Sequence, residues 1–440
     1  MNWPVRRLAA VHLLALALLG WASGCAHIFS ADSRTDCADR QPEGTHLSNT
    51  DSAYCSLEEL QRIEVDATGL RPSTAQDVRE YCHDNPLCAT IAATADERLP
   101  TRYEDAFFYP VARDLNLLVA DAAQSVVGRT VAPQRIGTLA SRNIQAEIIT
   151  DGPSKTPVIV VNTYLLLFCD ILQKIALETL AVNRAGDHIE IESKSKDELA
   201  EELRRHRLPV EHFAMAVEAF HRNLLPPHFE LPPEKLALQE LLEGIELFVI
   251  GHEYGHIVME SRGLDRAVHP WVRELQADCL GVRFLSAAAG LRPVSRHFSI
   301  SSPSREYVKT GALFYLAMID MLSMTEHRAY RTPYDSSDWS VDVVDNLAAD
   351  LRANNCAISA AATRLLTDAA PPEAGATHPP PRLRAVVVDL ELRKLLQPRD
   401  QRDKDLIALS TQLIHNLGTI TRVTIEWARP ASPESSGFRK

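Results

Sequence analysis

Residues 252–256 read His-Glu-Tyr-Gly-His inside the apolar run LFVIGHEYGHIVM, residues 247–259. On an α-helix, residues four apart lie one above the other on the same face, so the imidazoles of His252 and His256 can reach one ion. Glu253 then lies beside the ion rather than binding it. This arrangement is typical of a zinc hydrolase, in which the metal acidifies a water molecule and a glutamate accepts its proton. The pentapeptide therefore predicts a helical metal site with Glu253 as the general base.

A catalytic zinc site usually has three protein ligands and one open position, so a third ligand is expected. The segment VRELQADCLGVRFL, residues 272–285, has the apolar pattern of a partly buried helix. Its Glu274 and Asp278 are four apart and share a face, so one can bind the metal while the other accepts a hydrogen bond from a ligand histidine. A solvated acidic face is the alternative for this pair. His269, which precedes Pro270 in a predicted turn, is the rival third ligand.

The pentapeptide HEYGH followed by ELQAD, residues 274–278, resembles the zinc site of the gluzincin metallopeptidases. The stretch THPPPRLR, residues 377–384, is similar to an element of the HtpX and CaaX-prenyl-protease-like family, which includes BepA-like periplasmic lipoproteins. The short gap between the first two blocks also fits other gluzincins.

This resemblance implies a site that holds one Zn²⁺ ion per chain. The implied metal ligands are His252, His256 and Glu274, with Glu253 as general base, Asp278 as a support for a ligand, and His378 and Arg384 as catalytic residues that steady the oxyanion or the substrate. Two alternatives stay open for His378, which precedes three prolines: a solvated linker residue, or a ligand that covers the metal in a latent form.

The N-terminus has the pattern of a lipoprotein signal peptide. Two arginines, at positions 6 and 7, precede an apolar stretch and the sequence Ala-Ser-Gly-Cys, which ends at Cys25. We expect cleavage before Cys25 and lipidation of its thiol, and Ala26 after it is usual for outer-membrane lipoproteins. The alternative is a plain secretory signal with an incidental cysteine. The pattern predicts a location in the bacterial cell envelope, anchored to the outer membrane and facing the periplasm.

The net charge of −12, with no basic cluster to offset it, argues against a nucleic-acid partner. Seven cysteines follow Cys25, and an exported protein meets an oxidising compartment. Cys37 with Cys55 and Cys82 with Cys88 are close enough in sequence to pair, and the odd total leaves at least one cysteine unpaired. The apolar stretch 308–324 contains Lys309 and Asp320 and predicts a buried helix rather than a membrane span.

The predicted fold class is α+β, predominantly helical, with a small sheet and a zincin-type catalytic domain. Residues 158–161, Val-Ile-Val-Val, are the clearest strand, and we interpret them as the edge strand that holds substrate, with an ordinary core strand as the alternative. The predicted parts are a signal peptide (1–24), a polar cysteine-bearing tether and small helical region (25–100), the catalytic domain (101–368), a proline-rich connection (369–381), C-terminal helices (382–429) and a disordered tail (430–440).

Together these features predict a zinc-dependent endopeptidase of the cell envelope, active in protein quality control by family analogy alone. Its expected partners are protein or peptide substrates and, through the lipid anchor, a membrane; the sequence does not specify an oligomeric state. Two alternatives remain: a non-catalytic zinc-binding lipoprotein for envelope assembly or chaperone-like binding, and a narrowly specific regulatory protease.

Overall fold

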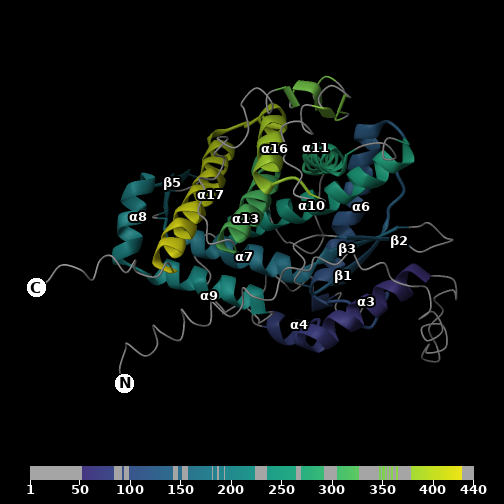
Figure 1. Cartoon of the computed structure of the whole chain (residues 1–440), viewed down its shortest axis with the longest axis horizontal. Helices are drawn as coiled ribbons and strands as arrows, with labels where there is room; N and C mark the ends of the chain where they lie inside the picture. The colour runs from purple at the N-terminus through teal and green to yellow at the C-terminus, as the bar shows by residue number, and fades with distance from the viewer. Residues whose placement is uncertain are drawn as a thin grey trace, which may run out of the picture.

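The protein is predominantly helical and contains a small three-stranded sheet, which confirms the α+β class (Figure 1). The computed structural model describes residues 52–83, 92–93, 99–141, 147–150, 157–180, 182–185, 188–192, 194–222, 235–263, 269–291, 305–326, 346–347, 349–351, 353, 356, 358–359, 363–364 and 378–428. The predicted signal peptide, the Cys25 lipidation site and the C-terminal tail lie outside these residues.

The sheet consists of β1 (Arg135–Leu139), β2 (Glu147–Thr150) and β3 (Pro157–Asn162) in the order β1-β3-β2. β1 pairs parallel to β3, and β2 pairs antiparallel to it. The prediction that residues 158–161 form the edge strand is therefore wrong, because β3 is central. Its continuous apolar run suits that position, since a central strand with both faces covered has no polar side.

Helix α3 (Ser52–Thr68) covers one face of the sheet. Its Leu57 packs with Val158 and Val160 of β3, whereas Ile159 and Val161 point into the main core. The side chain of Gln61 in α3 donates a hydrogen bond of 2.6 Å to the carbonyl of Thr138 in β1. Helix α3 thus covers one face of the sheet and also hydrogen-bonds a backbone carbonyl of β1.

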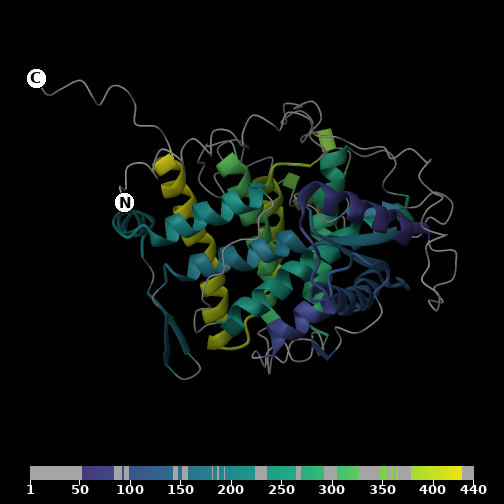
Figure 2. The same ribbon diagram turned by 90° about the horizontal axis from the view of Figure 1, so that it is seen from below.

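The remaining elements form a helical body beside the sheet. In chain order they are α4 (Ala75–Cys82), α6 (Phe108–Val127), α7 (Thr163–Leu177), β4 (Val182–Ala185), β5 (His188–Ile191), α8 (Lys196–Arg205), α9 (Leu208–Arg222), α10 (Lys235–Ser261), α11 (Pro270–Ala288), α12 (Arg305–Lys309), α13 (Gly311–Glu326), α16 (Pro381–Leu395) and α17 (Gln401–Ala428). The three-stranded sheet lies at one end of the molecule, and α8 with the β4–β5 hairpin lies at the other (Figures 1 and 2).

One hydrophobic core joins this body, and it includes side chains of α6, α7, α10, α11, α13, α16 and α17. The C-terminal helices therefore share their core with the helix that carries HEYGH. Residues 308–324 divide between α12 and α13 and are largely buried, as expected. Among the described residues, no helix is both long and apolar enough to cross a membrane.

The described cysteines include a disulfide that the sequence did not predict, Cys279–Cys356, across 77 residues. Cys55 and Cys82 are also disulfide-bonded, but their predicted partners, Cys37 and Cys88, lie outside the described residues. Cys169 is free and buried, which confirms that at least one cysteine stays unpaired.

Glycines bring three helix backbones close together around α10. A Cβ atom at Gly255 would lie 2.9 Å from the Cα of Ala277 in α11, and one at Gly251 would lie 3.2 Å from the carbonyl oxygen of Gly281. At Gly244, where α10 meets α12 and Gly311, a Cβ atom would overlap the carbonyl oxygen of Val308. The contacts at Gly244 and Gly255 exclude a Cβ atom, the contact at Gly251 barely admits one, and together they set the spacing between α10 and its neighbours.

Alanine substitutions at these glycines are expected to destabilise the fold in a graded order. Alanine favours a helix over glycine by up to about 1 kcal/mol, while overpacking costs about 1–3 kcal/mol or more. We expect Gly244→Ala to lower the free energy of unfolding most, Gly255→Ala less, and Gly251→Ala least or not at all. Denaturant unfolding of the three variants measures this order, and equal stabilisation by all three would contradict the close helix contacts.

Candidate metal centre

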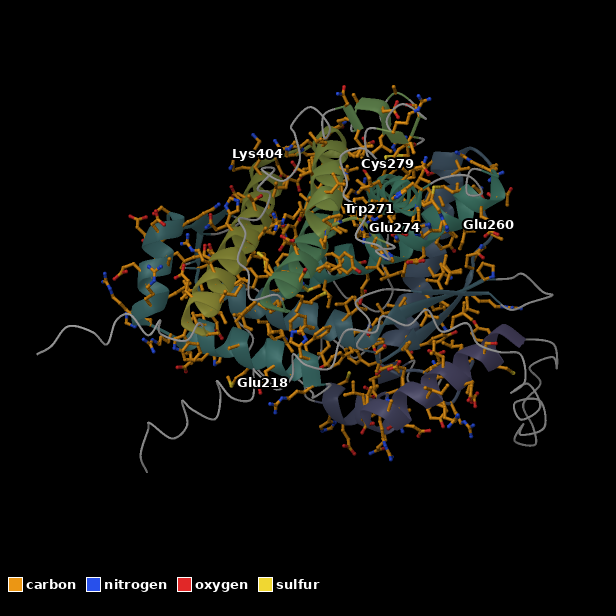
Figure 3. The ribbon with its side chains drawn as sticks, viewed as in Figure 1. Glu218, Glu260, Trp271, Glu274, Cys279 and Lys404 are labelled. Carbon is orange, nitrogen blue, oxygen red and sulfur yellow. A yellow bond between two sulfur atoms is a disulfide. The ribbon has the colours of Figure 1, made fainter. Side chains whose placement is uncertain are left out.

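The two histidines of HEYGH lie on α10, one turn apart, and face a carboxylate of α11. The Nε2 atoms of His252 and His256 are 3.2 Å apart. Glu274 completes a triangle, with Oε2 3.4 Å from His252 Nε2 and Oε1 3.4 Å from His256 Nε2. Figure 3 shows Glu274 on the helix that crosses α10. The structure thus brings together the three residues that the sequence predicts as ligands.

These three side chains fit a metal ion. Each offers one ligand atom, and the three atoms lie within 4.8 Å of one another in a buried position. Tetrahedral bonds of about 2.1 Å from nitrogen and carboxylate oxygen place ligand atoms about 3.4 Å apart, close to the separations in this triangle. The group could therefore hold a metal ion with a fourth position left for another ligand.

Asp278 orients the first histidine. Its Oδ1 is 2.9 Å from His252 Nδ1, and its side chain is completely buried. A hydrogen bond at Nδ1 fixes the tautomer and the tilt of the ring, which leaves Nε2 to face the triangle. Glu274 in the triangle and Asp278 behind His252 therefore match the expected pair on α11, one candidate acidic ligand and one acidic support.

Arg384 of α16 holds Asp278 in turn. Its Nε donates to Oδ2 at 2.8 Å and its Nη2 donates to Oδ1 at 2.7 Å, so the guanidinium binds both carboxylate oxygens. Arg384 is buried. Bidentate pairing of this kind fixes the carboxylate plane as well as its position. Both hydrogen bonds of Arg384 go to Asp278, so Arg384 acts on the ligand histidine His252 only by fixing Asp278.

The electrostatics of the triangle differ between its members. Burial lowers the pKa of His252, but hydrogen bonds to Asp278 and Glu274 outweigh burial and raise it to about 10. Burial and the neighbouring His252 lower the pKa of His256 to about 3. Burial raises the pKa of Glu274, yet the two histidines and Arg384 bring it down to about 2. Without a metal, a proton on His252 therefore balances the carboxylates at neutral pH.

His378 lies at the more open side of the triangle, just before α16. Its Nε2 is 3.3 Å from Glu274 Oε2, and its side chain is 31% exposed. Burial is the largest cause that lowers its pKa, so the imidazole is neutral near pH 7. The structure therefore places His378 beside the metal-ligand triangle, whereas the preceding residues of the proline-rich connection, 369–377, lie outside the described residues.

Glu253 and Tyr254 follow His252 on α10 and have different surroundings. Glu253 is buried, and its charge raises the pKa of Tyr315 in α13 behind the larger effect of burial. The hydroxyl of Tyr254 donates to Asn116 Oδ1 at 2.9 Å and accepts from the backbone N–H of Gln134 at 2.9 Å. Tyr254 thus joins α10 to α6 and to the residue just before β1.

Two further side chains near the centre are explained by the structure. His269 is the N-cap of α11, where its Nδ1 accepts a hydrogen bond from Trp271 N, and it is outside the triangle. The rival third ligand is therefore excluded from this arrangement. Tyr315 is buried, and its ring lies 5.9 Å from that of Phe248. The sequence does not single out Tyr315, because one tyrosine in an apolar helix carries no distinguishing signal.

Comparison of the chain with protein-family models, with curated proteins and with solved structures finds no match.

The metal content of the purified protein should follow the triangle. We expect about one ion per chain in the parent and much less in His252→Ala and Glu274→Ala, because each variant leaves two of three ligands. His269→Ala is the matched control and should keep the parent content. Elemental analysis after dialysis gives the ratio, and an unchanged content in the two ligand variants would exclude this site.

We expect Arg384→Lys to lower the metal affinity, because Arg384 fixes Asp278 and Asp278 orients the ligand His252. Lysine keeps the charge but not the bidentate contact, and loss of such supporting contacts typically lowers affinity about 10–100-fold. Arg382→Lys is the control, since Arg382 lies two residues away and pairs with Asp320 at 3.3 Å. Competition with a chromophoric chelator measures both, and equal affinities in the two variants would rule out the positioning role.

Proposed function

We propose that the chain is a zinc-dependent endopeptidase of the bacterial cell envelope. The observation that carries the proposal is the triangle of His252, His256 and Glu274 with Glu253 on the same helix. Two imidazoles and one carboxylate, spaced for tetrahedral bonds, are a donor set of catalytic zinc sites. The resemblance of HEYGH, ELQAD and THPPPRLR to gluzincin motifs points the same way.

The proposed mechanism assigns the proton transfer to Glu253. When bound, zinc supplies Lewis acidity, which makes water nucleophilic near neutral pH and polarises a carbonyl. The carboxylate of Glu253 accepts the proton of the attacking water and then passes it to the leaving amine. Its burial keeps this exchange away from bulk solvent. The peptide bond that breaks joins the carbonyl carbon to that amine.

The neighbouring residues have supporting roles in the proposal. His378, neutral and partly exposed beside Glu274, can donate a hydrogen bond to the oxyanion or to the substrate. Arg384 is a positioning residue, because its bonds reach the reaction only through Asp278 and His252.

The proposed location rests on the N-terminal sequence. A signal peptide of residues 1–24 would deliver the chain to the envelope, and lipid on Cys25 would anchor it to the outer membrane, with the metal centre in the periplasm. Quality control of envelope proteins is the use that this location and a peptidase activity suggest together. A narrowly specific regulatory protease is the alternative within the same chemistry.

Replacing the general base should separate catalysis from metal binding. We expect Glu253→Gln to lower peptidase activity roughly 10²–10⁴-fold, as for loss of an acid–base catalyst, while zinc content stays at the parent level. Cleavage of a mixed envelope extract, read by gel and mass spectrometry, measures the activity. Full biological activity of Glu253→Gln would instead favour the non-catalytic zinc-binding lipoprotein.

The same assay distinguishes the alternatives for substrate range and for His378. Many cleaved proteins indicate a general protease, whereas a single product indicates a narrow one. His378→Ala should lower activity if the imidazole assists the reaction. A rise in activity would mean that His378 covers the metal position, as in a latent form.

A further inference from the structure

Helix α3 is attached to the sheet through two buried side chains that are one turn apart. Leu57 and Gln61 are buried, whereas the other α3 side chains that the structure describes are at least partly exposed. Leu57 packs with Leu139, Val158 and Val160 in a small cluster that is separate from the main core. The buried attachment of α3 therefore consists of one apolar and one polar contact, and the polar contact depends on the partners of Gln61.

Gln61 contacts both β1 and the carboxyl group of Glu104. Its Nε2 donates to the carbonyl of Thr138 at 2.6 Å and to Glu104 Oε1 at 3.2 Å. Glu104 Oε2 accepts from the backbone N–H of Thr138 at 2.6 Å and from its hydroxyl at 2.5 Å. The hydroxyl of Thr101 donates to Gln61 Oε1 at 2.6 Å and so fixes the orientation of the amide. Glu104 thus lies between α3 and β1 and is hydrogen-bonded to both.

The carboxyl group of Glu104 is surrounded by neutral donors. It is 2% exposed, and no ion pair within the residues that the structure describes includes it. Its charged neighbour is the carboxyl group of Asp105, which is also buried and accepts hydrogen bonds from the backbone N–H groups of Phe107 and Phe108. A second carboxylate so close opposes the ionisation of Glu104.

The other charged side chains of these elements interact with one another or with solvent. On α3 and in the segment before α6 they form ion pairs, namely Arg102 with Glu58, and Arg62 with Glu59 and Asp66. The guanidinium groups of Arg102 and Arg135 also lie over the rings of Tyr103 and Tyr54. Arg71, before α4, is exposed. A buried carboxylate without a cationic partner is costly, so a proton is what compensates Glu104 beneath α3.

We propose that Glu104 is a proton-controlled latch for α3. The neutral carboxyl group holds α3 on the sheet, and loss of its proton weakens the attachment, because a carboxylate is favoured where α3 no longer shields it from water. Release of α3 would uncover Val158 and Val160 on one face of β3. The latch is apart from the metal-ligand triangle and needs no peptidase activity.

The direction of the pH effect follows from the pKa of Glu104. Burial outweighs the hydrogen bonds from Thr138 and Gln61 and raises this pKa to about 7, from an ordinary value of 4.5. Where α3 is released and water reaches the carboxyl group, the pKa returns toward the ordinary value. The attachment of α3 is therefore strongest below about pH 4.5, weakens as the pH rises toward 7, and stays weak above about pH 7.

Hydrogen exchange of the α3 backbone, read by mass spectrometry, measures the latch in the purified full chain. Protection is expressed relative to an unstructured peptide at the same pH. We expect the protection of α3 to fall about 10–100-fold between about pH 5 and about pH 8, while that of the buried helix α7 stays constant. Glu104→Gln should abolish this fall. Glu58→Gln is the matched control, since Glu58 is a surface carboxylate of α3 paired with Arg102, and it should keep the fall.

Three outcomes would overturn the latch. The first is equal protection of α3 at both pH values in the parent, and this test needs no variant, so it decides even where Glu104→Gln does not fold. The second is a folded Glu104→Gln that keeps the pH dependence of the parent. The third is a loss of protection in α7 that accompanies the loss in α3, because the whole chain then unfolds and no local release occurs.

Discussion

The completely buried carboxylate of Asp278 is the contact on which the metal centre depends. It accepts two hydrogen bonds from Arg384 of α16 and lies 2.9 Å from Nδ1 of His252 in α10, so one side chain of α11 joins three helices. A buried charge is tolerated only when it is paired and fully hydrogen-bonded, and removing one partner costs about 3–5 kcal/mol. The contact that orients the ligand histidine therefore also holds the C-terminal helices on the body.

The glycines of α10 explain how a carboxylate from another helix comes within reach of both histidines. Gly251 and Gly255 flank the HEY triplet and face Gly281 and Ala277 of α11 at distances that exclude a Cβ atom or barely admit one. Larger residues would separate the two backbones, and the separations of 3.4 Å between Glu274 and the two histidines would not survive. Small residues at this crossing are thus part of the metal centre, although none of them touches the ion position.

The centre was largely predictable from the sequence because its parts are local. His252 with His256, and Glu274 with Asp278, are four-residue spacings on single helices, and such spacings fix a shared face before any tertiary packing is known. The bond from Arg384 to Asp278 spans 106 residues and depends on how α16 packs against α11. The strand order placed β3 in the centre, and the Cys279–Cys356 bond spans 77 residues. Neither leaves a pattern in one stretch of sequence.

Charge balance distinguishes the buried acidic pair of α11, Glu274 with Asp278, from that of α10, Glu243 with Glu246. In the metal centre, the negative charges of Glu274 and Asp278 face Arg384 and a proton on His252, whose pKa is about 10 after the competing effects of burial and its acidic partners. Glu243 and Glu246 have no such partners among the described residues. Burial instead raises the pKa of Glu243 well above its ordinary value and that of Glu246 to about 8, so the low-dielectric interior favours the neutral carboxyl group in this pair.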